Sequence, residues 1–94
     1  MMTSKIEIMF HATFREITKK KKITEEVKED SIVAEILDKL ADRYGKDFKD
    51  IYDPKTGIIS TEVLIMLNGR GIRAVNEKIT DKDVLVITLP LGGG

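Results

Sequence analysis

Residues 84–94 read VLVITLPLGGG, an apolar run followed by a proline and three glycines. β-Branched and leucine side chains favour a strand, and Pro90 predicts its end at Leu89 because proline cannot donate to a sheet ladder. Glycines carry no side chain, so residues 90–94 are expected to form a flexible tail thin enough to enter a narrow channel in another protein. A frayed terminus or an expression remnant is the other interpretation of this tail.

Before this segment, the alternation of apolar and polar residues predicts further strands. They cover residues 5–14, 23–27, 62–67 and, more weakly, 72–75. In the strand at 5–14, Ile6, Ile8, Phe10, Ala12 and Phe14 share one face.

Apolar residues at helical spacing predict one long helix, from Ile32 to Tyr44. Ser31 can cap its N-terminus, and Gly45 suits a left-handed C-cap. Residues 46–52 could form a short helical turn, and turns are expected at residues 53–57, 68–69 and 81–83. The order of elements predicts a single α+β domain over residues 1–94.

The composition excludes several classes of function. The chain has no cysteine and one histidine, which excludes a disulfide framework and argues against a His-based metal site or a catalytic triad. Its 16 basic and 16 acidic residues give zero formal charge, so we expect no nucleic-acid or membrane partner. Residues 19–22 form a lysine run that we interpret as a solvated loop. No signal peptide is visible, so a cytoplasmic location is expected.

The predicted sheet has apolar residues on both faces, although one helix covers only one of them. We expect the outward side chains to form a surface for a partner protein. The alternative is that residues 46–59 fold over them. This outer face comprises Met9, His11, Leu64, Met66, Val84, Val86 and Thr88.

The ordered motifs resemble the ubiquitin-like sulfur-carrier family, which includes the molybdopterin synthase small subunit (MoaD), the thiamine-pathway carrier (ThiS) and the archaeal ubiquitin-like modifiers. The matching pieces are FHATFRE at 10–16, DSIV at 30–33, LNGR at 67–70, and DKDV at 81–84 leading into LPLGGG at 89–94. The resemblance spans essentially the whole chain. It implies a β-grasp fold, a mixed sheet packed on one main helix.

The resemblance also implies a chemistry at Gly94, with Gly93 beside it. An E1-like enzyme would use ATP to adenylate the Gly94 carboxylate, and a sulfur donor would then leave a thiocarboxylate for cofactor synthesis, molybdopterin first among the candidates. The chain itself would bind no cofactor or metal. Its expected partners are the E1-like enzyme, the molybdopterin synthase large subunit, a sulfur donor and target proteins. Partner contact is assigned to Gly92, Leu91, Arg15, Arg70 and the outer face.

Two other functions stay open at this point. The chain could be a protein modifier joined through Gly94 to target lysines, or a non-covalent β-grasp binding module. An independent enzyme is not expected, because the sequence shows no nucleophile–base set, carboxylate pair or phosphate loop. His11 could tune partner binding by titrating near neutral pH, or it could be an ordinary exposed residue.

Overall fold

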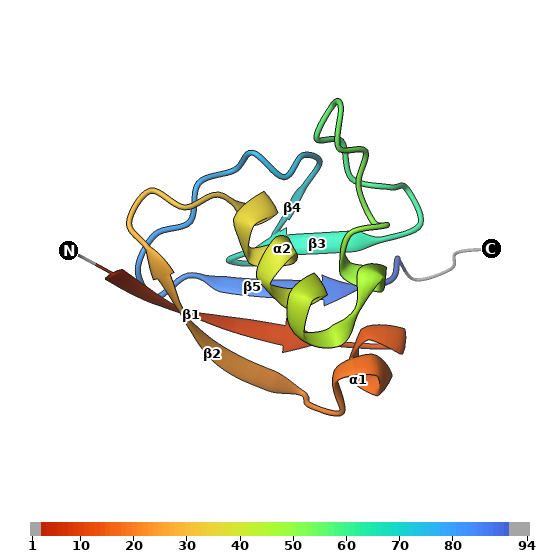
Figure 1. The fold of residues 1–94 in the computed structure, drawn as a ribbon, viewed down its shortest axis with the longest axis horizontal. Coiled ribbons are helices and arrows are strands. Elements are labelled where there is room, and N and C mark those ends of the chain that lie inside the picture. The colour runs from red at the N-terminus through yellow and green to blue at the C-terminus, as the bar shows by residue number, and fades with distance from the viewer. Residues whose placement is uncertain (1–2, 91–94) are drawn as a thin grey trace.

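A mixed sheet and one long helix make up the computed structural model, which describes residues 3–90 (Figure 1). The helices are α1 (Thr13–Thr18), α2 (Val33–Tyr44) and the 3-10 turn η1 (Lys46–Phe48). The strands are β1 (Thr3–Phe10), β2 (Lys22–Lys28), β3 (Leu64–Leu67), β4 (Arg70–Ile72) and β5 (Val84–Thr88).

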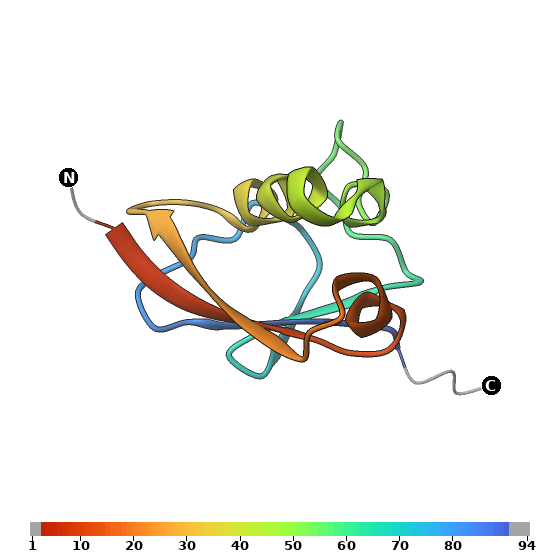
Figure 2. The ribbon, with the colours of Figure 1, turned by 60° about the horizontal axis from the view of Figure 1, so that its bottom comes forward.

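The five strands lie in the order β2-β1-β5-β3-β4, so the last strand of the chain is the central one. β5 runs parallel to β1 and antiparallel to β3, while the β1–β2 and β3–β4 pairs are antiparallel. The long helix α2 crosses one face of this sheet (Figure 2). The α+β class and the β-grasp arrangement expected from the sequence are therefore confirmed.

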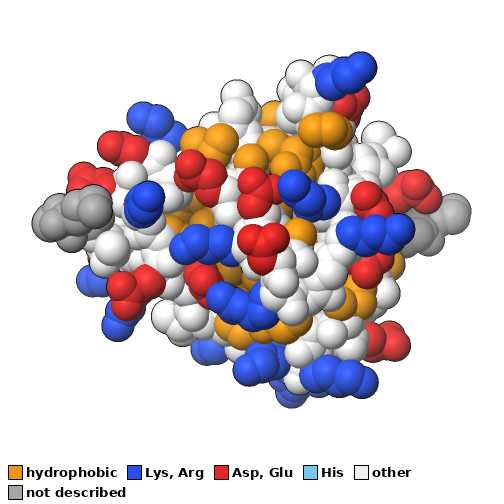
Figure 3. All heavy atoms as spheres, viewed as in Figure 1, with side chains coloured by type: hydrophobic (Ala, Val, Ile, Leu, Met, Phe, Trp, Pro, Cys, Tyr) orange, Lys and Arg blue, Asp and Glu red, His pale blue; other side chains and the backbone are white. Residues whose placement is uncertain are grey.

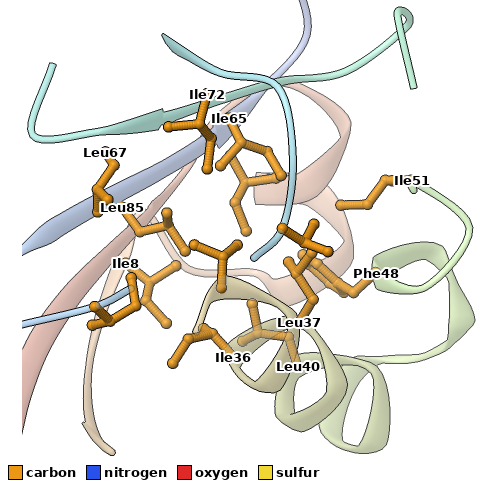
Figure 4. Packing of buried hydrophobic residues seen from close by; sticks show 14 of the residues in the cluster. Ile8, Ile36, Leu37, Leu40, Phe48, Ile51, Ile65, Leu67, Ile72 and Leu85 are labelled. Atoms are coloured by element: carbon orange, nitrogen blue, oxygen red, sulfur yellow. The ribbon is translucent and has the colours of Figure 1, made fainter. Parts of the chain in front are cut away.

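The core lies between α2 and the inner face of the sheet. Ile36, Leu37 and Leu40 of the helix are almost completely buried, as are Ile8 and Leu85 of the sheet (Figure 4). Because the inward residues alternate along each strand, every second side chain of β1, β3 and β5 belongs to this core.

The segment after α2 closes the core at one end. Phe48 is fully buried, and its ring lies 5.8 Å from that of Phe10 and 5.5 Å from that of Phe14. Ile51 and Ile59 are also part of the core cluster. Residues 46–59 therefore pack on the helix side, and the idea that they fold over the outer face is wrong.

The predicted helix is confirmed to within one residue, but its ends differ from expectation. Ile32 occupies the N-cap position, and its backbone N–H donates to the Glu35 carboxylate at 3.0 Å. Ser31 instead donates its hydroxyl to the Lys28 carbonyl at 2.6 Å. Gly45 ends the helix with φ +119° and ψ 171°, a conformation that favours glycine but lies outside the left-handed helical region.

The first strand is shorter than predicted, because the chain turns at Ala12 with φ +55°. Thr13–Thr18 then form helix α1. The alternation in the sequence predicts Thr13 and Phe14 as the end of the strand, and it predicts no helix here. Phe14 still reaches the core, but from the helix, where it packs against Phe48. Ala12 is exposed instead of sharing the buried strand face.

The other strand boundaries also shift. The Ser60 hydroxyl accepts a hydrogen bond from the Glu62 N–H, and the Ser60 carbonyl accepts one from the Val63 N–H. These bonds keep residues 60–63 in a turn, so β3 begins at Leu64. β4 covers Arg70–Ile72 and not 72–75, because the backbone beyond Ile72 pairs with the loop at 58–59 instead of with β3. β5 ends at Thr88, one residue before the predicted end.

Candidate functional site

The outer face of the sheet carries a row of apolar side chains across its three middle strands. The register places Met9 of β1 beside Val86 of β5, and Val86 beside Met66 of β3. We call these three residues the outer row. All three are half-buried, whereas their chain neighbours Ile8, Ile65 and Ile87 are buried completely on the inner face.

Three more half-buried residues, Leu64, Thr88 and Val84, extend the outer row along the strands. Leu64 pairs with Thr88, and Val84 lies beside Glu7 of β1. The side with α2 looks different, because lysine, arginine, aspartate and glutamate are intermixed over it (Figure 3). The outer face is thus a mainly aliphatic surface on the opposite side of the sheet, with methionines that can adapt to different partners.

A polar network holds the start of β5 and thereby the register of the outer row. Asn68 donates its side-chain amide to Asp83 at 2.8 Å and accepts a hydrogen bond from the Val84 backbone at 2.9 Å. Asp83 also accepts from the Thr80 backbone N–H at 2.8 Å and from the Thr80 hydroxyl at 3.0 Å. The turn after β3 is therefore tied directly to the first residue of β5.

The protonation of Asp83 follows from this network. Burial by itself raises the pKa of the Asp83 carboxyl, but the hydrogen bonds from Asn68 and Thr80 outweigh burial and lower the pKa below its ordinary value. Asp83 is consequently an ionised acceptor at neutral pH that stabilises the turn.

β5 leads directly from the outer row to the end of the sequence. It has a hydrogen-bonded neighbour on each side, and the His11 backbone N–H extends the β1 side by donating to Ile87 at 3.1 Å. Leu89 and Pro90 follow and are exposed. The ThiS family model matches residues 8–94. The chain belongs to the ThiS family.

Solved structures similar to this ThiS-family chain share its fold along nearly the full length. The Haloferax volcanii HVO 2177 protein is 27% identical, with a TM-score of 0.79 over 98% of this chain and 88% of that one. A putative molybdopterin converting factor, subunit 1, from Pyrococcus furiosus is 22% identical, with a TM-score of 0.75 over 94% and 99%. Small archaeal modifier protein 1 from Methanosarcina acetivorans is 23% identical, with a TM-score of 0.75 over 99% of each chain. No curated protein matches the sequence significantly.

Membership of the ThiS family confirms the resemblance to the ubiquitin-like sulfur-carrier family, and with it the expectation that the chain is not itself an enzyme. Within residues 3–90, no group of three or more metal-ligating side chains could hold an ion. None of the helices in that range is long and apolar enough to cross a membrane.

His11, a predicted contact residue of the ThiS-family chain, directly follows β1 and is exposed, and its backbone N–H donates to Ile87 of β5. Two other predicted contact residues, Arg15 and Arg70, lie away from the outer row. Arg15 lies on α1 and lines a separate hollow with Lys19–Lys21. Arg70 pairs with the inward-facing Leu67 and forms an exposed ion pair with Glu77 at 3.2 Å, so the register places it toward the helix side of the β4 edge. Their part in partner binding stays a prediction.

Leu91, Gly92, Gly93 and Gly94, the predicted reactive and contact residues of the tail, lie outside the described residues. The structure adds Ile58 near Pro90, which sequence reasoning missed, and brings Arg73 to the same place. Ile58 follows the turn at 53–57, and an apolar residue next to a turn was the available signal. The position of Arg73 beside Ile58 depends on the pairing of two loops, which the sequence pattern did not predict.

Proposed function

We propose that this ThiS-family chain is a sulfur carrier whose Gly94 carboxylate is adenylated by an E1-like enzyme and converted to a thiocarboxylate. The observation that supports it most is the path of β5. The central strand carries Val86 of the outer row and ends at Thr88, six residues before the end of the given sequence. A partner that grips the outer row is thereby positioned to receive the glycine tail.

The proposed chemistry has two steps and transfers no electrons. A Gly94 carboxylate oxygen attacks the α-phosphorus of ATP held by the activating enzyme, and pyrophosphate leaves. Hydrosulfide then attacks the acyl carbon, the bond from that carbon to the AMP oxygen breaks, and a proton is released. This chain contributes the carboxylate, the absence of bulk at Gly93 and Gly94, and the binding surface. ATP is used by the partner and is not a cofactor of the chain.

We propose molybdopterin synthesis as the pathway, with the synthase large subunit as the recipient of sulfur. The fold shared with the Pyrococcus furiosus molybdopterin converting factor subunit supports this choice. One chain in the structure of the BexX/CysO complex from Amycolatopsis orientalis also has this fold, with a TM-score of 0.72. Its occurrence in a complex supports the proposal that this chain works with a partner protein. We expect the carrier to work in the cytoplasm, where ATP is available.

A second candidate function is that of a protein modifier attached through Gly94 to target lysines. The shared fold with small archaeal modifier protein 1 of Methanosarcina acetivorans favours it. Both functions begin with the same adenylate and differ in the nucleophile that attacks it. Trypsin cleaves this chain last after Lys82, so a remnant of residues 83–94 on lysines of other proteins in the source cell would identify the modifier.

Intact-mass spectrometry tests the proposal. The chain is incubated with ATP, sulfide and the E1-like enzyme of its source, beside a control chain that lacks Gly93 and Gly94. The expected result is a mass increase equal to the exchange of one oxygen for sulfur in the full chain alone. An adenylate without a sulfur product would favour the modifier. An unmodified chain, in a reaction where the enzyme modifies another carrier, would refute both functions and leave the binding module.

A further inference from the structure

A groove lies beside the point where the chain leaves β5. It has a volume of about 520 Å³ and is lined by the loop at 58–63, the start of β3, the end of β4 and Pro90. The lining is mainly apolar, from Ile58, Val63, Leu64 and Ile72, with Arg73 as its charged member. We call it the tail-exit groove. It adjoins the outer face, because Leu64 belongs to both.

Ile58 is an unusually exposed apolar side chain on the wall of this groove. Its side chain is 53% exposed, and the next large hydrophobic residue within 3–90 is Leu89 at 38%, immediately before Pro90. The most exposed aliphatic side chains of that range thus flank the same exit. Exposed aliphatic side chains that lie together in a small domain indicate a binding surface.

The backbone around Ile58 is held in place, so the exposure does not come from a loose loop. The Ile58 N–H donates to the Thr56 hydroxyl at 3.2 Å, and its carbonyl accepts from the Asp53 N–H at 2.9 Å. Ile58 also forms a bridge with Ala74, and the Ile59 N–H donates to the Arg73 carbonyl at 2.8 Å. An aliphatic side chain on a fixed backbone loses less entropy on binding than one on a loose loop, which suits Ile58 to anchor a contact.

Arg73 gives the tail-exit groove its charge preference. The salt bridges found within residues 3–90 use Arg43 and Arg70 but not Arg73, which is exposed and remains available to a partner carboxylate. An arginine next to an aliphatic pocket complements a segment that presents an aliphatic side chain followed by aspartate or glutamate.

We propose that the tail-exit groove binds such a segment, an aliphatic side chain flanked by an acidic one, on the adenylating enzyme. This inference rests on the proposed function. The location of Pro90 in the groove wall supports the choice of partner, because residue 91 follows it directly and an enzyme that encloses the tail must approach this wall. The groove then contributes affinity and leaves the chemistry at Gly94 unchanged.

The test compares full-length variants as substrates of the enzyme that adenylates the wild-type chain, with pyrophosphate release as the readout. Ile58→Ala and Arg73→Glu are each expected to raise KM about fivefold or more with kcat unchanged, because a binding contact remote from the reacting atoms is lost. Lys55→Glu is the matched control: it reverses a charge in the same loop but does not line the groove. Added salt should raise the wild-type KM more steeply than that of Arg73→Glu.

The outcomes separate this inference from the proposed function. If the wild-type chain is not adenylated, the proposed function fails first. If it is adenylated and both groove variants keep KM within about twofold of wild type, or lose kcat instead, the groove assignment is wrong. If Ile58→Ala raises KM while Arg73→Glu does not, the acidic residue assigned to the partner is wrong. Amide NMR spectra of each variant confirm that it is folded.

Discussion

Replacing Asn68 by alanine probes the network that fixes the start of β5. The Asn68 amide donates to the Asp83 carboxylate at 2.8 Å, and its carbonyl oxygen accepts from the Val84 N–H at 2.9 Å. Its backbone has φ +54°, a left-handed conformation that asparagine tolerates and alanine does not. The substitution therefore removes two hydrogen bonds and adds backbone strain.

The expected loss can be estimated from these three contributions. The bond to the buried carboxylate of Asp83 is worth about 1.5 kcal/mol, and the more exposed bond to Val84 about 0.5 kcal/mol. An alanine held at positive φ costs about 1 kcal/mol more. We expect Asn68→Ala to lower the free energy of unfolding by about 3 kcal/mol, a large part of what a small domain has.

Urea unfolding at neutral pH, followed by far-UV circular dichroism, measures this loss. Asn68→Gly removes the same hydrogen bonds without the backbone strain, so it should be more stable than Asn68→Ala by about 0.5–1 kcal/mol. Exposed Asn76→Ala is the matched control and should change stability by less than about 0.5 kcal/mol. A loss below about 1 kcal/mol for Asn68→Ala would refute the importance assigned to the network.

Four further predictions concern the core, the outer row, the tail and pH. Phe48→Ala should cost about 3–5 kcal/mol in urea unfolding, because it empties a site between the rings of β1, α1 and α2. Val86→Glu should stay folded by NMR but raise the KM for adenylation about tenfold or more, and an unfolded variant would mean that Val86 is core. Gly93→Leu should abolish adenylation measured by pyrophosphate release and leave the urea midpoint unchanged. The lowered pKa of Asp83 means that its stabilisation is present above the ordinary carboxyl pKa of about 3.9 and is lost as pH falls through the lower folded value. Below about pH 4 the urea midpoint of wild type should therefore fall more steeply than that of Asp83→Asn.

Long periodic segments were predictable from the sequence, and short or non-local features were not. Helix α2 and strand β5 were located to within a residue because apolar spacing over many positions reflects a buried face. Helix α1 was missed because Ala12 offers no side-chain cap and the helix is six residues long. The spacing of Phe14 and Ile17 was consistent with a helix, but Phe14 also continued the alternation of β1.

The candidate site also has one part that was predictable from the sequence and one part that was not. Met9, Met66 and Val86 could be placed on one face from strand alternation, since side chains on a strand point to opposite faces in turn. The tail-exit groove could not, because it depends on loop residues 58–59 pairing with Arg73 and Ala74, which are far from them in sequence and carry no pattern.

The central position of β5 also determines when the protein can fold during its synthesis. During translation β5 is the last of the five strands to be made, so β1 and β3 lack their shared neighbour until β5 has left the ribosome. Chains that stop before Val84 lack this strand and cannot close the sheet. The strand that completes the sheet is thus also the strand that precedes the glycine tail, so under the proposed function the activating enzyme receives Gly94 on a domain whose sheet is already closed.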